Sequence, residues 1–348
     1  MARKILVISR KLFFDLYTPG LRAYGDEYDD ITIDLYELDY PKNKLGIIDK
    51  LKYKFDVCNF RKKYYAKIRR DLCKIVENYD ELLFINLFFD KEYFIQGKFK
   101  EILYKKKTNV LFADSIKLFS EEIDFWNVFN RVFSFEFDDI DYAKEKYGID
   151  VEYNPIGTSY FLFDKTYGRK KYDVCFVGLA TKNRLEYLEK ISGWCFKNNK
   201  KLYISGHFWH DNNWLNYHIG KIKFNYKYPM LAKYVKNIFI NPKELAQLYC
   251  DSKIVLNINV PHHRGFNQRN FDVMMCKSLL ICGNQDATGI DVKNGKDFVM
   301  CSDADDMIQK INYYLVNNDR RDEIIDNAYI KVENKFLFKH TLDRIFKE

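Results

Sequence analysis

Short apolar runs alternate with longer, charged, helix-like stretches through the first half of the chain. The runs are KILVISR (4–10), ITIDLYEL (31–38), ELLFINL (81–87), NVLFADS (109–115) and RVFSFE (131–136). Runs of this length, rich in β-branched and aromatic residues, are typical of buried strands. Their alternation with helix-like stretches predicts a parallel sheet covered by helices.

A second series of apolar runs begins after a break at Pro155–Gly157 and the basic segment GRKKY (168–172). It comprises DVCFVGL (173–179), KLYISGH (201–207), NIFIN (237–241), KIVLNINV (253–260), SLLICGN (278–284) and DFVMCS (297–302). The chain is therefore predicted to be an α/β protein with two successive Rossmann-like, doubly wound domains joined near residues 155–172.

The expected boundaries are 1–165 for the first domain, 166–330 for the second and 331–348 for a closing segment. A length of 348 residues suits two domains of about 100–200 residues each. Apolar residues at near-helical spacing over 321–348 predict one or two closing helices. Ligands of open α/β sheets bind outside the carboxyl ends of the strands, so we expect the chemistry in a cleft where the two domains face each other.

The segment HHRGFNQRNFD (262–272) carries the strongest indication of a ligand site. A polar loop with Arg264, Asn267 and Arg269 follows an apolar run, and a helix is expected to start near Asn270. Free N–H groups at a helix N-terminus beside an arginine fork suit a diphosphate. Asp272, expected in the first turn, could accept hydrogen bonds from ribose or sugar hydroxyls. The alternative is an ordinary helix capped by Asn270.

Two further loops follow predicted strands of the second domain. In the first, Gly178 precedes Lys182 and Arg184 at the start of a helix; its single glycine does not make a dinucleotide fingerprint, but it allows close backbone approach beside two cations. In the second, Gly206 and His207 follow an apolar run and either border a nucleotide base or form a plain turn.

Composition narrows the choice of partners and of compartment. The net charge of +8 and the 17% aromatic content favour anionic partners, although a biased base composition of the gene also explains them. The eight cysteines form no C-x-x-C pair and are expected to be core thiols, and His262 and His263 have no cysteine nearby, so no metal is predicted. With only Ile5–Ile8 as an early apolar run, we expect no signal peptide or membrane span and a cytoplasmic protein.

Residues 44–77 differ from the rest, because they mix lysine and arginine with tyrosine, phenylalanine and leucine in a basic amphipathic pattern. Such a helix could rest on the anionic inner face of a membrane. The alternative is a solvated helix whose apolar stripe covers the first sheet. Nucleic acid is not expected as a partner, since no RNP, KH or zinc-finger pattern accompanies these residues.

Several motifs of the second half resemble, in order and spacing, the CgeB-like glycosyltransferases of the glycosyltransferase group 1 superfamily. They are YDVCFVG with Arg184, SGHFW, ELAQLYCDSKIVLNI (244–258), RNFDVMMCKSLLIC and HTLDRI (340–345). The resemblance implies the GT-B fold, a nucleotide-sugar held mainly by the second domain, an acceptor held mainly by the first, no essential metal or cofactor, and a C-terminal helix that crosses back to the first domain. Asp272 and Lys277 depart from the glutamate and glycine of the relatives, which puts the choice of donor in doubt.

On this resemblance, the expected function is transfer of a hexose-type sugar from a nucleoside diphosphate sugar, most favourably a UDP-sugar, to a polysaccharide, glycolipid or glycoprotein acceptor. The expected donor-binding residues are Gly178, Lys182, Arg184, Gly206, His207, Arg264, Asn267, Arg269, Asn270, Phe271 and Asp272. Asp114 and Asp15 are the preferred candidates for a general base, ahead of Glu136 and Asp139; a retaining mechanism needs none. A non-catalytic sugar-nucleotide or glycan-binding protein and a nucleotide-sugar epimerase are the alternatives.

Overall fold

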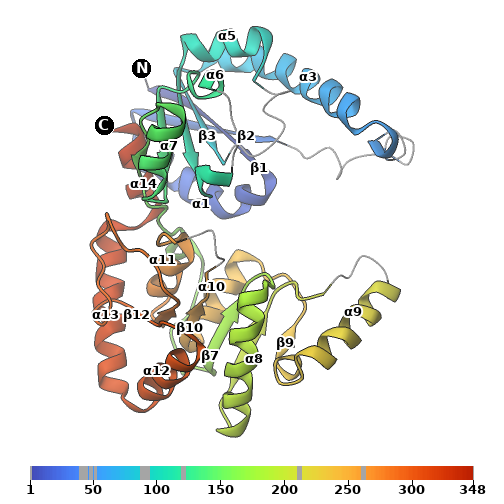
Figure 1. The fold of residues 1–348 in the computed structure, drawn as a ribbon. Helices are drawn as coiled ribbons and strands as arrows, with labels where there is room; N and C mark the ends of the chain where they lie inside the picture. Colours follow the sequence, from blue (N-terminus) through green and yellow to red (C-terminus); the bar gives the residue numbers. More distant parts are fainter. Residues whose placement is uncertain are drawn as a thin grey trace. The chain divides into compact units, whose positions relative to one another are not determined.

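The computed structural model describes residues 2–38, 46, 50, 53–86, 95–118, 123–209, 214–259 and 264–347, with the backbone alone at 11–15 and 123–124. The chain forms two compact units, and each is described by itself (Figure 1). The first comprises Met1–Asn154 with Thr341–Glu348, and the second comprises Pro155–His340.

The first unit is built on a parallel six-stranded sheet in the order β2-β1-β3-β4-β5-β6. Its strands are β1 (Arg3–Arg10), β2 (Ile31–Leu38), β3 (Glu81–Ile85), β4 (Lys107–Phe112), β5 (Arg131–Ser134) and β6 (Glu152–Tyr153). Its helices are α1 (Lys11–Glu27), α3 (Val57–Ile75), α5 (Gly97–Lys105), α6 (Ile123–Trp126), α7 (Asp139–Tyr147) and α14 (Phe338–Phe346). All five predicted strands are present. The two-residue β6 is too short to give a sequence pattern.

The second unit contains another parallel six-stranded sheet, in the order β12-β11-β10-β7-β8-β9. Its strands are β7 (Tyr172–Val177), β8 (Leu202–Ser205), β9 (Val235–Lys236), β10 (Ser252–Asn257), β11 (Leu279–Cys282) and β12 (Val299–Met300). Its helices are α8 (Lys182–Lys197), α9 (Trp214–Lys227), α10 (Pro242–Cys250), α11 (Gln268–Met275), α12 (Ala304–Val316) and α13 (Asn318–Lys335), with a 3-10 turn, η4, at Tyr160–Leu162.

One predicted strand of the second unit is wrong. The apolar run 237–241 is not a strand; the edge strand β9 ends before it, at Lys236. Asn237 instead accepts hydrogen bonds through its side chain from the backbone of Phe208 and Trp209, at 2.6 and 3.2 Å. Asn241 then caps α10 by accepting from the N–H of Glu244. Local side-chain bonds to the backbone therefore replace strand pairing here.

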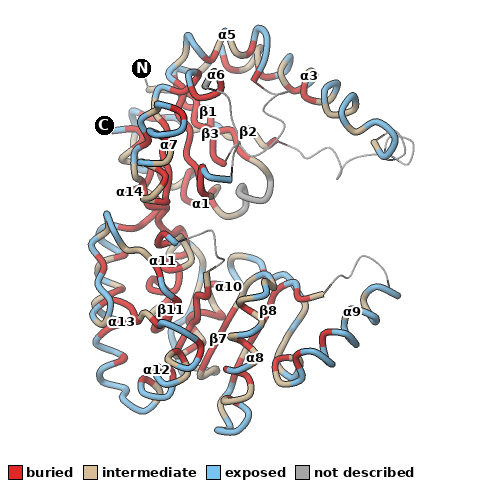
Figure 2. Tube along the Cα trace, viewed as in Figure 1, coloured by how far each residue is buried: buried red, intermediate tan, exposed pale blue. Residues whose placement is uncertain are grey.

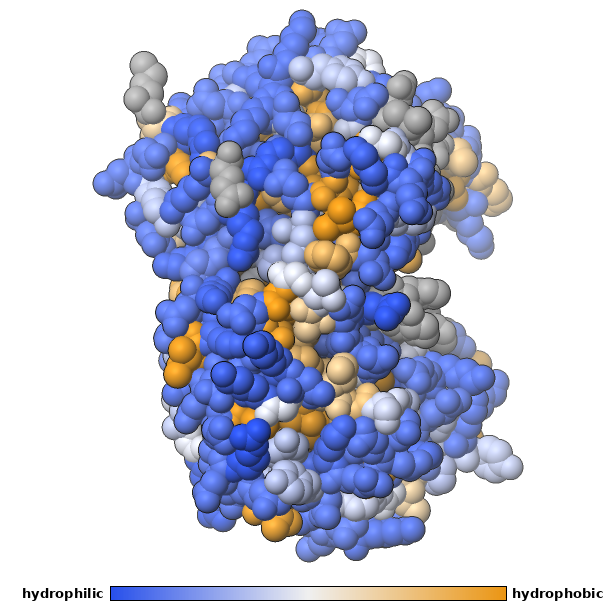
Figure 3. Space-filling model, turned by 60° about the vertical axis from the view of Figure 1, so that its left-hand side comes forward, coloured by the Kyte–Doolittle hydropathy of each residue, from blue (hydrophilic) through white to orange (hydrophobic). Residues whose placement is uncertain are grey.

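Each sheet has its own apolar core. Figure 2 shows the strands buried and the helices exposed on their outer sides. Because helices cover both faces of each sheet, its strands appear in the sequence as apolar runs. Six of the eight cysteines are buried thiols, whereas Cys58 is exposed and Cys73 is half-buried. The face of the molecule drawn in Figure 3 is mainly hydrophilic, with apolar side chains in limited groups.

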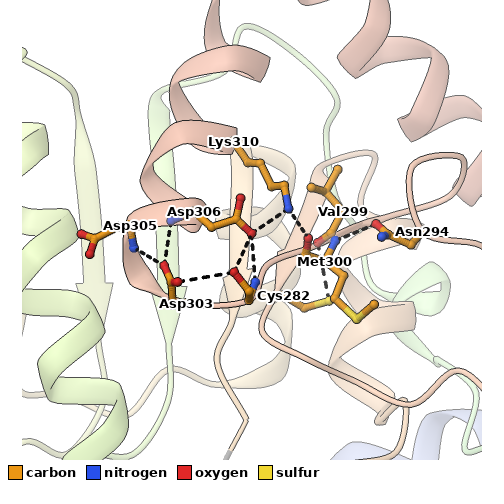
Figure 4. A network of polar contacts seen from close by, with 9 residues as sticks. Cys282, Asn294, Val299, Met300, Asp303, Asp305, Asp306 and Lys310 are labelled. Carbon is orange, nitrogen blue, oxygen red and sulfur yellow. Dashed lines mark hydrogen bonds and ion pairs between the residues drawn. The ribbon is translucent and has the colours of Figure 1, made fainter.

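Polar contacts fix the outer edge of the second sheet (Figure 4). Asp303 caps α12 by accepting hydrogen bonds from the N–H groups of Asp305 and Asp306, each at 2.9 Å. Lys310 donates to the carbonyl oxygen of Met300 at 2.7 Å and to Asp306 at 2.8 Å. These bonds attach the two-residue strand β12 to the start of α12. They add to the few hydrogen bonds that β12 makes with its neighbouring strand.

The C-terminal helix α14 returns to the first unit, as the resemblance implied. Tyr24 donates a hydrogen bond to Asp343 at 3.0 Å, and Arg3 donates to the carbonyl oxygen of Phe346 at 2.8 Å. Asn154 donates to the carbonyl oxygen of Thr341 at 3.1 Å. Burial of this helix end explains its apolar spacing.

The structure divides the chain after Asn154 and after His340, rather than at the predicted 165/166 and 330/331. The reason is a short parallel pairing between the segment that follows Asn154 and the segment that precedes His340. Thr158 accepts from the N–H of Phe338 at 3.0 Å and donates its own N–H to Phe336 at 2.9 Å. This pairing, here named the crossover pair, places both segments in the second unit.

Gly157 is expected to be indispensable to the crossover pair. A Cβ at this position would lie 2.4 Å from the backbone of Leu337, which cannot yield as a flexible side chain would. Gly157→Ala should therefore lower the free energy of unfolding by about 2–3 kcal/mol or more, measured by calorimetry. Gly168→Ala, where a Cβ meets nothing within 4 Å, is the matched control. Equal melting temperatures for the two variants would contradict the argument.

Candidate functional site

A chain of side-chain amides lies at the carboxyl edge of the second sheet, where β10 ends. Asn257, the last residue of β10, accepts a hydrogen bond from the guanidinium of Arg269 at 3.3 Å. Its amide nitrogen donates to Asn270 at 2.5 Å and to Asn267 at 3.3 Å. The strand end is thereby joined to the beginning of α11.

The amide chain continues outward from Asn270 and ends in an unused donor. Asn270 donates to Gln285 at 2.5 Å, and Gln285 donates to the side-chain oxygen of Asn259 at 2.7 Å. The amide nitrogen of Asn259 is buried and has no hydrogen-bond partner among the described residues. A buried donor without a partner costs free energy, so a ligand that accepts from it would recover that cost.

The N-terminus of α11 differs in detail from the prediction. The helix begins at Gln268, not near Asn270, and its N-cap Asn267 makes no capping bond with its side chain, which is engaged by Asn257. Asn270 lies inside the helix and is not a cap, and Asp272 lies beyond the first turn. A helix start without a side-chain cap leaves N–H groups directed at an incoming anion.

Arg184 of α8 is one of two arginines at this edge. Its guanidinium donates to the carbonyl oxygens of Ile258 and Leu179, at 2.7 and 3.1 Å, and lies over the ring of Phe176. Burial, with a smaller contribution from the charge of Arg269, lowers the pKa of Arg184 to about 10. No ion pair joins either arginine to a carboxylate within the described part of the chain, so their charge is available to an anion.

Two predicted glycines face each other between β7 and β8. Gly206 has a φ of +147°, and a Cβ there would lie 1.9 Å from the carbonyl oxygen of Gly178. The N–H of Gly178 in turn donates to the carbonyl oxygen of Ser205 at 2.9 Å. Glycine is therefore required at position 206, and the close approach brings the β7 and β8 loops together beside Arg184.

Asp272 lies on the side of α11 that faces the crossover pair. Its carboxyl group is buried, accepts a hydrogen bond from Thr158, and leaves its oxygen Oδ1 without a partner among the described residues. Burial raises the pKa of Asp272 to about 7, against the opposing effects of Thr158 and Arg269. The carboxyl group can thus gain or lose a proton near neutral pH.

The remaining candidates of the second unit are placed less centrally. Lys182, the first residue of α8, and His207 are exposed, and Arg264 is exposed with its carbonyl oxygen accepting from the N–H of Asp286. Phe271 is fully buried and stacks on Phe336 with ring centroids 4.7 Å apart. Phe271 is accordingly part of the packing that holds α11.

In the first unit, Asp114 follows β4 and accepts a hydrogen bond from the side chain of Asn86 at 3.0 Å. Asp15 belongs to α1, and its side chain lies outside the described residues. Asp139 is fully buried and accepts from Ser115, Ser134 and the N–H of Ile116. Asp139 is therefore a structural carboxylate, whereas Asp114 is half-buried at the carboxyl edge of its sheet.

Four residues of this site were not predicted from the sequence, namely Asn257, Asn259, Gln285 and Thr158. A signal existed for the first two, because they interrupt the apolar run KIVLNINV at alternate positions. Gln285 follows the next apolar run, yet its pairing with Asn270 depends on two segments that meet only in the fold.

Within the described residues, no group of three or more His, Cys, Asp and Glu side chains is arranged to hold a metal ion. His262 and His263 lie outside the described residues. None of the described helices is long and apolar enough to cross a membrane.

Comparison with known proteins agrees with these features in the second half of the chain. Residues 185–347 match the model of a family described as glycosyl transferase-like. This part of the chain is therefore similar to that family. No curated protein matches the chain.

Solved structures are similar over almost the whole length. A sucrose-phosphate synthase from Thermosynechococcus elongatus has a TM-score of 0.65 at 11% identity, covering 99% of this chain and 98% of the other. HepE from Anabaena in complex with UDP has a TM-score of 0.63 at 11% identity, covering 99% and 98%. A UDP-N-acetylglucosamine 2-epimerase, described as putative, from Listeria monocytogenes has a TM-score of 0.57 at 10% identity, covering 100% and 97%. At these identities the likeness establishes the GT-B fold.

The protonation of Asp272 should appear in the pH dependence of stability. The folded protein keeps this proton up to about pH 7, whereas an unfolded chain releases it near pH 4. The native state therefore loses stability as the pH rises through this interval. Asp272→Asn should remove this loss of stability. The free energy of unfolding of the variant, relative to that of the natural protein, should therefore increase between pH 5 and pH 8 by on the order of 3 kcal/mol.

Denaturant unfolding at a series of pH values measures this difference. Asp326→Asn, at an exposed position of the neighbouring helix α13, is the control and should follow the natural protein at every pH. A constant offset for Asp272→Asn from pH 5 to pH 8 would show that the carboxyl group titrates normally in the fold.

Proposed function

We propose that the protein is a metal-independent glycosyltransferase of the hexosyltransferase type that uses a nucleoside diphosphate sugar, with a UDP-sugar as the favoured donor. The observation that carries the proposal is the group formed by Arg269, Arg184, the start of α11 and the free amide of Asn259 at one sheet edge. Two positive charges and backbone N–H groups complement a diphosphate, and an amide donor suits a carbonyl or hydroxyl oxygen.

The two arginines differ in what they can do. Arg184 donates two hydrogen bonds to backbone carbonyl oxygens, which hold the loop after β7 in place. Its contribution to an anion is therefore mainly its positive charge. Arg269 makes one hydrogen bond among the described residues, to Asn257 at 3.3 Å, and keeps further donors for phosphate oxygens. Stabilising the charge that develops on the leaving diphosphate is the chemical step that this arrangement supports.

For the acceptor we propose a polysaccharide, glycolipid or glycoprotein chain reaching the first unit, and for the subtype we propose the CgeB-like glycosyltransferases. Asp114, at the carboxyl edge of the first sheet, is the proposed general base, with Asp15 as the other candidate. The bond from Asn86, at 3.0 Å, orients the carboxylate of Asp114.

An epimerase acting on the nucleotide sugar alone is the second candidate, because a UDP-N-acetylglucosamine 2-epimerase has the same fold. A non-catalytic nucleotide-sugar or glycan-binding protein is the third. Incubation with a UDP-sugar separates these functions: an epimerase forms a new UDP-sugar without acceptor, a transferase releases UDP only when acceptor is consumed, and a binding protein does neither.

The donor site is tested by thermal shift against UDP-, GDP-, CMP- and dTDP-sugars in the presence of a chelator. We expect a shift with one nucleotide class, corresponding to about 2.7 kcal/mol at a hundredfold excess over Kd. Arg269→Ala should abolish the shift, whereas Arg169→Ala, an exposed arginine away from the sheet edge, should retain it. Absence of a shift with every donor would contradict the nucleotide-sugar assignment.

We further propose a location at the cytoplasmic face of the membrane, with peripheral contact through residues 44–77. Within this range, α3 covers the first core with Tyr65, Ile68 and Leu72, as the solvated-helix alternative expected, and its other side carries lysines and arginines. A hollow of about 540 Å³ at the N-terminal part of α3 is lined by the aromatic residues Phe55, Phe60 and Tyr64, by Lys63 and Lys67, and by Asp56 and Asn59. Basic and aromatic groups together suit an anionic lipid surface.

Charge reversal of Lys62, Lys63, Arg69 and Arg70 to glutamate should weaken association with anionic vesicles at low salt by at least about tenfold. Reversal of Lys293, Lys296, Lys335 and Lys339, four exposed or half-exposed lysines of the second unit, makes the same change in net charge and is the control. Unchanged association after reversal on α3 would argue against this contact.

A further inference from the structure

Helix α9 packs on the second unit through one face only. Phe224 is buried against Phe208 and Trp209, with ring centroids 5.8 and 5.1 Å apart, and Tyr217 lies edge-on to Trp209 at 6.0 Å. A Cβ on Gly220 would lie 3.0 Å from that of Trp209, so the helix backbone sits close to the indole. Residues 217, 220 and 224 form one side of the helix.

The opposite face of α9 is apolar and exposed. Leu215, Ile219, Ile222 and Tyr226 follow each other at spacings of four, three and four residues, which places them in one line along a helix. Ile222 is 68% exposed and Tyr226 is 91% exposed. Trp214, at the first position of the helix, is 75% exposed. We call the four residues in line the α9 stripe, and Trp214 precedes its first residue; Figure 2 shows the exposed side of α9.

The segment that carries the α9 stripe is itself positively charged. Residues 214–241 contain Lys221, Lys223, Lys227, Lys233 and Lys236 and no aspartate or glutamate. Lys221 and Lys223 are exposed and lie on either flank of Ile222. An apolar line with aromatic ends and flanking lysines is the pattern of a helix that lies in a membrane interface.

The charge pattern also argues against a second copy of the chain as the occupant. A two-fold contact through the α9 stripe would place the lysines of both copies against one another without a carboxylate from this segment to compensate. An anionic bilayer offers the apolar depth for the stripe and negative headgroups for the lysines at the same time.

We propose that α9 is a docking surface for an anionic phospholipid membrane, with Leu215, Ile219, Ile222 and Tyr226 immersed at the level of the headgroups. This surface belongs to the second unit and is independent of the contact through residues 44–77 and of sugar transfer. It would hold the nucleotide-binding unit itself at the bilayer surface.

Flotation of the purified full chain with vesicles tests the proposal, with phosphatidylcholine alone compared with mixtures containing phosphatidylglycerol. We expect binding to the anionic vesicles only, weakened by added salt. Ile222→Glu should reduce the partition coefficient by about tenfold or more. Ile330→Glu is the matched control, since it makes the same change at an isoleucine that is 55% exposed on α13, and it should bind as the natural protein does.

The fluorescence of Trp214 gives a direct report of immersion. Its emission should shift to the blue on binding and be quenched by brominated lipid, and Trp214→Phe should remove this shift while most binding is retained. Melting temperatures check that Ile222→Glu folds, as expected for a replacement at an exposed position.

Three results would overturn the proposal. They are binding of Ile222→Glu equal to that of the natural protein, equal binding to phosphatidylcholine vesicles, and a dimer in sedimentation velocity that Ile222→Glu dissociates. Charge reversal on α3 distinguishes the two proposed membrane contacts. If the α3 variant loses all vesicle binding and Ile222→Glu loses none, the contact belongs to α3 alone.

Discussion

The crossover pair is the interaction on which the rest of the second unit's site depends. Gly157 and Thr158 approach the backbone of residues 336–338 so closely that a side chain at position 157 has no room. The same short segments also touch α11. Gly157 accepts a hydrogen bond from Gln268, Thr158 donates to Asp272, and Phe336 stacks on Phe271. The place where the chain passes between its units thus holds the helix that carries Arg269.

Helix α11 is consequently held from two sides. The crossover pair contacts one side, and the amide chain from Asn257 through Asn270 to Gln285 contacts the other. Hydrogen bonds between neutral amides position side chains without adding charge, so the potential at this edge is set by Arg184 and Arg269. A rigid helix start beside two arginines is a pre-organised arrangement for an anion.

Asp272 modifies this positive site. Its carboxyl group is buried near Arg269, and its pKa of about 7 means that the site changes its charge over the physiological range. Thr158 is the hydrogen-bond donor that limits this shift. The hydroxyl group of Thr158 therefore links the crossover pair to the charge of the site. This link could not be predicted from the sequence, because Thr158 and Asp272 are far apart in it.

Two features of the chain were determined by its sequence alone. Strands covered by helices on both faces are mainly apolar, so every strand of four or more residues appeared as an apolar run. The single break at Pro155–Gly157 marked the passage to a second series. Gly206, which follows β8 and must be glycine, and Arg184, in the first turn of α8, also stood out in the sequence, because their residue types are visible there.

Only the tertiary structure decided the rest. The helix α11 starts at Gln268 without a side-chain cap, because Asn257, at the end of β10, engages the side chain of its N-cap Asn267. The unit boundaries moved to Asn154 and His340 because the crossover pair joins segments about 180 residues apart. Strands of two residues, the amide chain and the raised pKa of Asp272 have the same origin. They arise from long-range contacts and from burial, which local patterns of apolar and polar residues do not encode.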